Sequence, residues 1–368
     1  MAEQLLIRPN MRYECHGDGT CCTSIHLLGP LKKSEAKAVE KASKIVFSKP
    51  LPKVVEYHPG NRDLALAIDK NRCVFLDERA HCRLHRAVGM DQKPRVCRRF
   101  PVGATQTPQG IRVTLSHRCP CVSIGDAPLL DTKRASAILA RPKGGIGVDI
   151  YVGEVIRWRG RRTIGFDEYV AWERNLIEQL LGVGSARRDT NSGATLGEWL
   201  PRIENLLGMR SAVELPPLKG RTWDEVGKEM LAWTRDESDT DGFFCTVRWA
   251  GRELKDKRYP WRPPLRPWSW TLERTAKRVE KPVDIRRIFG TWIADFFWSM
   301  AWTADGCVHQ ALADICARYA LANRLMDRLH ETGARNDIAA AEAIMIVDTV
   351  AASDPWQSVK KHLKRLAE

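Results

Sequence analysis

Eight of the eleven cysteines fall within the first 121 residues of this 368-residue chain, and cysteine thiolates are strong ligands for zinc and for iron-sulfur clusters. They are Cys15, Cys21, Cys22, Cys73, Cys82, Cys97, Cys119 and Cys121. Cysteines that act only as small apolar groups are expected within apolar, periodic segments. These cysteines instead lie beside turn-forming residues such as Gly17, Gly19 and Pro120, where several thiolates can converge on one site. The pattern predicts a metal or iron-sulfur site in preference to buried apolar cysteines or a redox switch.

The spacing of the cysteines favours an iron-sulfur cluster over a single zinc ion. A structural zinc site usually uses two C-x(2–4)-C pairs, whereas the gaps here are five, fifty, eight, fourteen, twenty-one and one residues. The adjacent Cys21 and Cys22 would point in different directions on an extended backbone and so serve two irons, or two sites. We expect a 4Fe-4S cluster, with zinc as the alternative. The C-x3-C-x2-C loop of radical S-adenosylmethionine enzymes does not occur. His81 and His85 flank Cys82 as alternative ligands, against the simpler interpretation that they are exposed or packed in the core.

Composition divides the chain into two parts. Residues 1–130 contain none of the thirteen tryptophans, and residues 151–368 contain all of them. At about 150 residues per domain, the length predicts two or three domains. We expect a cysteine-cluster domain over 1–142 and a helical, tryptophan-rich domain over 146–368, joined by the flexible stretch between them. The expected fold is mainly α (α+β), with a loop-rich first domain.

The first domain offers few regular elements. A helix is expected from Ser34, its N-cap, to Val46, because its apolar residues form one narrow stripe. A second helix is expected from about residue 131 to a point before Pro142. Loops and short strands fill the rest. Such a segment buries little apolar area by itself, so a bound metal would contribute strongly to its folding.

The second domain is expected to begin with strands and then to become helical. Apolar alternation over 148–164 predicts a strand or hairpin that turns near Gly160. Asp167 precedes a helical run that ends at Leu181, and the glycines that follow fit a helix C-terminus better than a nucleotide-binding loop.

Further helices follow from capping and periodicity. Thr195 with Glu198, and Thr222 with Glu225, both have the spacing of a capping box. Four more helices are expected at about 284–302, 307–330, 336–352 and 355–366.

The segment 258–270 is expected to be extended, because it contains four prolines. Trp261, Trp268 and Trp270 are interleaved with them. These tryptophans are interpreted first as packing residues and second as the lining of a groove for an extended peptide.

Charge and apolar runs bear on location and partners. The N-terminal stretch lacks a cationic flank followed by a long apolar segment, and no run approaches about 18 uninterrupted apolar residues, so we expect a cytoplasmic protein without a membrane span. The net charge of +14 favours polyanions or acidic protein surfaces as partners without specifying either.

Three cysteine-containing strings together resemble a known family. They are Cys15-HGDGT-Cys21-Cys22, the stretch Cys73-Val-Phe-Leu-Asp to His81-Cys82-Arg-Leu-His, and Pro94-Arg-Val-Cys97-Arg-Arg-Phe-Pro101. In this order they look like the cysteine-cluster proteins of the YkgJ type, which are regarded as zinc or iron chelators. The run Leu115-Ser116-His117-Arg118-Cys119-Pro120 and the helical tail are similar to the flagellin lysine-N-methylases, which carry the same signature. The specific part of the resemblance covers residues 12–122.

The resemblance implies ligands and an activity. The matched positions make Cys15, Cys21, Cys22, Cys73, Cys82, Cys97 and Cys119 the cluster ligands, with Cys121 an additional thiol and with Arg98 and Phe100 in support. The activity implied is methyl transfer from S-adenosylmethionine to lysines of a partner protein such as flagellin. That reaction requires a neutral lysine amine and hence a base or a desolvating pocket. Asp77 and Glu78 are candidates for that base, although carboxylates of this kind are more often on the surface, and the sequence does not identify the residue.

Two other functions remain open from the residues alone. One is a zinc- or iron-chelating or metal-chaperone protein without enzymatic activity, in which the helical tail would dock a partner. The other is a nucleic-acid binder that would use the +14 charge and segment 258–270, although no recognised RNA or DNA motif supports it.

Overall fold

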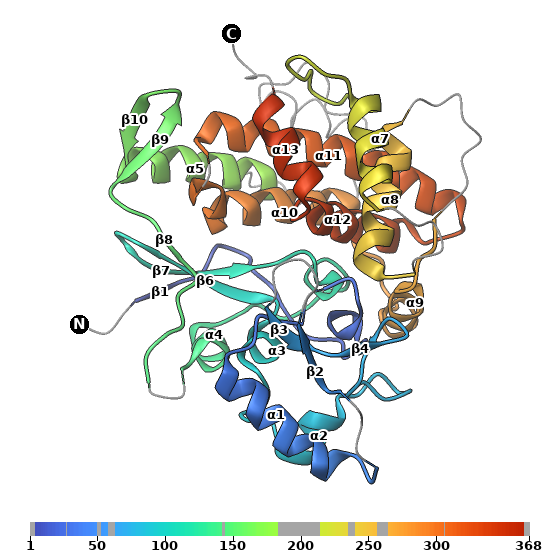
Figure 1. Ribbon diagram of the computed structural model, residues 1–368. Coiled ribbons are helices and arrows are strands. Elements are labelled where there is room, and N and C mark those ends of the chain that lie inside the picture. Colours follow the sequence, from blue (N-terminus) through green and yellow to red (C-terminus); the bar gives the residue numbers. More distant parts are fainter. Residues whose placement is uncertain are drawn as a thin grey trace.

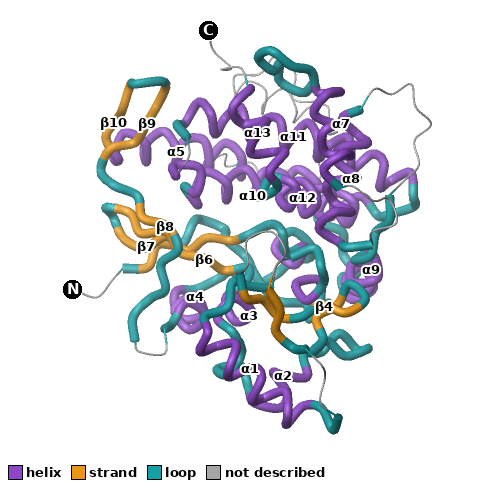
Figure 2. The backbone as a smooth tube through the Cα atoms, in the orientation of Figure 1, coloured by secondary structure: helices purple, strands orange, loops and turns teal. Residues whose placement is uncertain are grey.

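The structure is a computed structural model that describes residues 4–26, 28–49, 53–57, 63–141, 144–182, 214–234, 240–255, 264–304 and 306–363. These residues form twelve α-helices and a smaller amount of strand, so the described chain is mainly α with a minor β part. Figure 1 shows the long helices of the second half on one side and the short elements of the first half on the other. The same division appears in Figure 2, where the first half carries most of the strand and loop. No helix among the described residues has the length and apolar character needed to cross a bilayer.

A four-stranded sheet forms the centre of the first half and lies next to the helices (Figure 1). Its strands, in spatial order, are β1 (Leu5–Leu6), β7 (Gly110–Leu115), β6 (Val102–Thr107) and β8 (Ile150–Tyr151). The central pair is an antiparallel hairpin, and both outer strands run parallel to their neighbours. Ile111, Val113 and Leu115 alternate along β7 and are buried, the period-two pattern of a strand with one apolar face. This sheet was not predicted.

Short elements surround the sheet. They are η1 (Thr20–Cys22), β2 (Val55–Tyr57), β3 (Leu64–Leu66), β4 (Ile68–Asp69), β5 (Arg72–Cys73), α2 (Arg83–Val88), α3 (Arg95–Arg99), η2 (Pro120–Val122) and α4 (Thr132–Leu139). The expected second helix is α4, and Asp131 caps it by accepting a hydrogen bond from the Arg134 backbone N–H at 2.7 Å. Loops and short pieces therefore dominate this half, as expected.

Helix α1 (Lys33–Val46) matches the expected helix except at its start. Ala36, Val39 and Ala42 form its buried stripe. The predicted cap at Ser34 is wrong, because Ser34 lies in the first turn and Lys32 is the N-cap. The Glu35 carboxylate accepts a hydrogen bond from the Lys32 backbone N–H at 2.9 Å, so the helix start is capped two residues earlier than predicted.

The predicted hairpin near Gly160 is present as β9 (Val155–Arg159) and β10 (Arg162–Gly165). It leads directly into α5 (Phe166–Leu181), which begins one residue before Asp167. Gly182 ends α5 with φ +65°, a left-handed conformation that glycine adopts without strain. The glycine-containing stretch after Leu181 thus begins with a helix stop, as predicted.

The second half consists of packed helices. They are α7 (Trp223–Trp233), α8 (Gly242–Leu254), α9 (Ser269–Arg278), α10 (Ile285–Ser299), η3 (Ala301–Ala304), α11 (Val308–Glu331), α12 (Asn336–Val350) and α13 (Asp354–His362). The last four expected helices are therefore present, with small shifts at their ends. Thr222 and Glu225 form the predicted capping box at the start of α7. The Thr195–Glu198 pair lies outside the described residues.

Helices α8 and α9 were not predicted. The expectation of an extended chain up to Trp270 is wrong at its end, because α9 already begins at Ser269. Trp261 and residues 256–263 lie outside the described residues.

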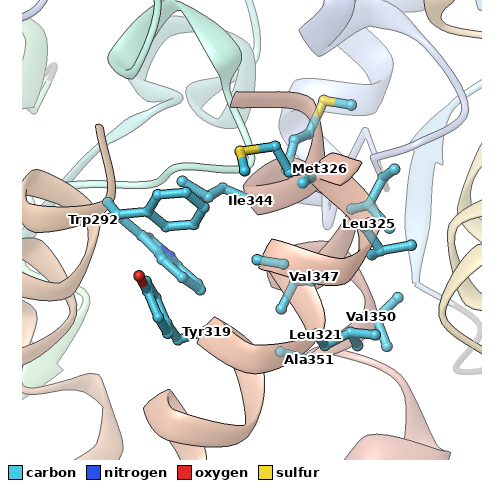
Figure 3. Packing of buried hydrophobic residues seen from close by; sticks show 14 of the residues in the cluster. Trp292, Tyr319, Leu321, Leu325, Met326, Ile344, Val347, Val350 and Ala351 are labelled. Carbon is cyan, nitrogen blue, oxygen red and sulfur yellow. The ribbon is translucent and has the colours of Figure 1, made fainter. Parts of the chain in front are cut away.

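A large apolar core lies in the helical half, and Figure 3 shows part of it. A smaller apolar cluster joins β9, β10 and α5. Trp292, Tyr319 and Ile344 meet there from α10, α11 and α12 and are essentially inaccessible to solvent. Ile25 and Ile124, from the first half, also belong to this core. The helices consequently provide a rigid surface against which the cysteine-bearing segments pack.

Buried ion pairs cross the expected boundary between the two halves. Arg8 Nε lies 2.7 Å from Asp295 Oδ1, and Arg112 Nη1 lies 2.8 Å from Glu173 Oε1. Strand β8, which follows the expected boundary, pairs with β6. The division of the chain into domains at 142–146 stays a prediction. Residues 4–141 are called the cysteine-rich region, and residues 144–363 the helical region.

Candidate metal centre

Five of the eight candidate cysteines line one cavity of about 50 Å³, which we call the thiol cavity. They are Cys21, Cys22, Cys73, Cys82 and Cys97. The remaining lining is mostly apolar and includes Leu28, Phe75 and Leu84, together with His26 and Lys93. At about 10–15 Å³ for each water-sized sphere, this volume has room for several atoms.

Short elements that are far apart in sequence carry these thiols into one place. An isolated bridge between Thr23 and Arg72 holds the end of η1 beside β5, so Cys22 lies near Cys73. A second bridge, between Leu76 and Cys82, folds the next segment back. Cys82 is the N-cap of α2, where its Sγ accepts the His85 backbone N–H at 3.4 Å.

Burial governs the protonation of these thiols. It raises the pKa of Cys73 and raises that of Cys97 to about 12. The hydrogen bond with Cys21 lowers the pKa of Cys22, but burial and the neighbouring thiols raise it overall. Burial by itself lowers the pKa of Lys93, but the charges of Cys82 and Cys97 raise it above its usual value. A cation in this cavity would bind the deprotonated thiols and release their protons.

The other three candidates form a second group, the thiol triad of Cys15, Cys119 and Cys121. The Cys121 side chain hydrogen-bonds to both of the others, and it also approaches Asp18 Oδ2 at 3.3 Å. The hydrogen bond from Cys121 lowers the pKa of Cys15 to about 6. Cys21 links the two groups, since its Sγ is 3.8 Å from that of Cys22, the charge of Cys15 raises the pKa of Cys21, and the charge of Cys21 acts on Cys119.

The arrangement differs from a site for one ion. Among the described residues, no group of three or more histidine, cysteine, aspartate or glutamate side chains is placed so that it could hold a metal ion. A zinc ion needs its sulfur donors about 2.3 Å from one point. The thiols of the cavity instead surround a space, and soft donors around a space of this size suit a centre that contains several atoms.

Several other candidates fall outside the thiol cavity. His81 and His85 are exposed, and neither lines it. Asp77 accepts hydrogen bonds from the backbone N–H groups of Arg79 and His81, so its carboxylate closes a turn. Glu78 is exposed.

His26 is a site residue that the sequence reasoning missed. It is buried, lines the thiol cavity, and lies beside the Arg118 backbone. Burial lowers its pKa well below the usual value, so the ring is neutral and able to act as a ligand. Its position four residues after Cys22 was the only available signal.

A larger cleft adjoins the thiol cavity. It has a volume of about 800 Å³, and Val96 and Phe100 line both spaces. The Phe100 ring packs against His26 with their centroids 4.9 Å apart, so this pair belongs to the wall between them. The cleft is lined by both regions, and we call it the inter-region cleft.

Acidic side chains that line the inter-region cleft form ion pairs and hydrogen bonds with neighbouring residues. Asp149 accepts two hydrogen bonds from Arg99, at 3.0 and 2.7 Å. Asp314 pairs with Arg318 at 2.5 Å. His117 connects Ser123 to Asp295, with 3.0 Å at each ring nitrogen. Because both of its ring nitrogens have partners, His117 fixes the segment between β7 and η2.

Trp268 does not line a groove of the kind considered as the second interpretation of segment 258–270. This side chain is fully buried, and its Nε1–H donates to Glu342 at 2.7 Å. Trp270 packs against the Arg72 guanidinium, 4.2 Å from the ring centroid. The packing interpretation of both residues is therefore the better one.

Comparison of the chain with protein-family models, with curated proteins and with solved structures finds no match. What these residues do is accordingly argued from their own geometry and chemistry.

Proposed function

We propose that this chain is an iron-sulfur protein whose cluster binds in the thiol cavity. The observation that carries the proposal is the convergence of five cysteines, from four separate short segments, on one small and largely apolar space. Scattered structural cysteines would have no reason to share a cavity. The resemblance to the YkgJ-type family points the same way.

The residues of the cavity divide into ligands and supporting groups. Cys22, Cys73, Cys82 and Cys97 would hold a 4Fe-4S cluster, and Cys21 stands between the cavity and the thiol triad. The cluster would supply electron transfer or Lewis-acid chemistry. Lys93 offsets the negative charge of the thiolates. Phe100 and the apolar lining limit the access of water.

Metal and sulfide analysis tests the proposal. Protein purified without oxygen should be brown and contain iron together with acid-labile sulfide. Cys97→Ser should lose most of both. Cys307→Ser is the matched control, because Cys307 is a buried N-cap in the helical region, where serine is a good substitute. Colourless protein with zinc alone, or full iron content in Cys97→Ser, would contradict the proposal.

A second candidate is methyl transfer from S-adenosylmethionine to lysines of a protein such as flagellin. The observation that favours it is the inter-region cleft beside the thiol cavity, because 800 Å³ is within the usual range for a cofactor-sized ligand, about 300–1,000 Å³. Calorimetry with S-adenosylmethionine should give saturable heat, and incubation with flagellin should give methyl-lysine. No heat with an intact cluster would favour a metal-chelating protein.

A further inference from the structure

The arginines that line the inter-region cleft differ in their pairing. Six cationic side chains line the cleft, against five acidic ones. Three of the arginines are already engaged: Arg95 and Arg99 bind Asp149, and Arg318 binds Asp314. Arg118 differs from them. Within the described part of the chain, no hydrogen bond or ion pair holds its side chain, and its Nε is buried without an acceptor.

The backbone around Arg118 is held firmly. Arg118 lies between β7 and η2, where the Cys119 N–H donates to the Ser116 carbonyl at 3.2 Å. His117 points to Asp295 on one side, and Cys119 belongs to the thiol triad on the other. The Arg118 side chain is thereby presented to the cleft and not to the core.

Among the described residues, no carboxylate forms an ion pair with Arg118. Burial lowers its pKa, and the charge of Asp348 opposes that effect. The Asp348 carboxylate, however, accepts hydrogen bonds from Trp292 Nε1 at 3.1 Å and Arg318 Nη1 at 3.4 Å. Arg118 is half-buried and its Nε is inaccessible to solvent, so an unpaired charge here is costly, and a bound anion would reduce that cost.

The rest of the lining indicates the shape of the ligand. Phe100 from the cysteine-rich region and Trp292, Phe296 and Trp302 from the helical region line the same cleft. Aromatic walls of this kind favour a flat ring system, which packs against them and buries apolar area.

We infer that Arg118 anchors the carboxylate or phosphate of a small ligand whose flat ring system packs against the aromatic side chains of the inter-region cleft. Two charge-assisted hydrogen bonds from one guanidinium suit either oxyanion. The inference adds a ligand class to the second candidate function and rests on it only for the choice of probes. Iron and sulfide content, which report on the cluster, are read separately.

Calorimetry on the purified holoprotein with three adenine-containing probes tests the inference. Adenosine carries no anion, adenosine monophosphate carries a phosphate, and S-adenosylhomocysteine carries a carboxylate. We expect at least one of the anionic probes to bind more tightly than adenosine, and the better one identifies which oxyanion the site prefers. Arg118→Gln should weaken that probe about 10- to 100-fold and leave adenosine within about twofold. Arg118→Lys should retain part of the affinity.

Arg324→Gln is the matched control, because Arg324 is a half-buried arginine of α11 that does not line the cleft. It should bind all three probes like the wild type, and thermal unfolding should show both Arg118 variants folded. The inference is overturned if no probe binds at millimolar concentration, if the anionic probes bind no better than adenosine, or if Arg118→Gln weakens every probe equally. If the purified protein contains no iron or acid-labile sulfide but binds the probes as expected, the proposed iron-sulfur function is contradicted and this inference still holds.

Discussion

In the helical region one large apolar cluster runs through α8, α10, α11 and α12, and a small one joins the β9–β10 hairpin to α5. The cysteine-rich region has no cluster of comparable size among its described residues and divides its buried apolar side chains between two smaller ones. Cys73 is a buried member of one of these small clusters, and Cys22, Cys82 and Cys97 pack against it. In the helical region, Cys245 and Cys316 are fully buried among apolar side chains and behave as small hydrophobic residues.

The two regions are therefore stabilised in different ways. The helices bury enough apolar surface among themselves to need no ligand. The cysteine-rich region leaves a cavity lined by thiols where a core would otherwise be filled. We therefore expect its stability to depend on what that cavity binds.

Removal of the metal should produce the largest effect. Structural thiolate sites contribute on the order of 10–16 kcal/mol in small peptides, which is comparable to the stability of a whole domain. A chelator or mild acid should make the cysteine-rich region sensitive to protease before the helical region. Limited proteolysis with mass spectrometry of the fragments checks this. Simultaneous digestion of both regions would contradict the expectation that only the cysteine-rich region depends on the metal.

Breaking the buried Arg8–Asp295 ion pair between the two regions should cause the second-largest loss of stability. Burial by itself raises the pKa of Asp295, but Arg8 and His117 lower it overall. Asp295→Asn leaves Arg8 buried without its counter-charge and should cost about 3–5 kcal/mol of unfolding free energy at neutral pH. Because the pKa is lower in the folded state, the contribution is complete above the ordinary Asp pKa and is lost as the pH falls through the lowered value.

Urea denaturation of wild type and Asp295→Asn at neutral and acidic pH measures that effect. The two proteins should converge in acid. Glu253→Gln is the control, since Glu253 pairs with Arg328 inside the helical region and that arginine is partly exposed. Equal unfolding midpoints at neutral pH would mean that the Arg8–Asp295 pair does not hold the regions together.

Cavity-creating substitutions in the two regions should lower stability alike but differ in their effect on iron content. Phe75→Ala in the lining of the thiol cavity and Ile344→Ala in the helical core should each lose about 2–5 kcal/mol of stability. Only Phe75→Ala should also lower the iron content, because only Phe75 borders the thiols. Iron analysis beside thermal unfolding checks the pair, and equal iron loss in both would argue against an independent helical region.

The smallest effect should come from the start of α7. Thr222→Ala removes the side chain that accepts the Glu225 backbone N–H at 3.2 Å, and should cost about 1 kcal/mol. The change should appear in the unfolding of the helical region and leave iron content unaltered. A drop in iron content would show that the two regions are coupled more tightly than the structure suggests.

Local signals determined the helical region well. The spans of α10, α11 and α12 and the capping box at Thr222 could be predicted, because apolar periodicity and caps involve residues within one or two turns of each other. The cap of α1 could not, since Lys32 is an unusual N-cap chosen by the position of Glu35. Helix α9 was missed because the prolines before it dominated the pattern.

The sequence alone determined that eight thiols lie among turn residues in a basic segment, a pattern that predicts metal chemistry. Only the tertiary structure decided that five thiols share a cavity while three form a triad beside it, and that His26 lines the same cavity as the five. It also decided that Arg118 faces a cleft in which the described residues offer it no ion pair. The reason is that these neighbours lie tens to hundreds of residues apart. Their meeting depends on packing between regions, which no local pattern encodes.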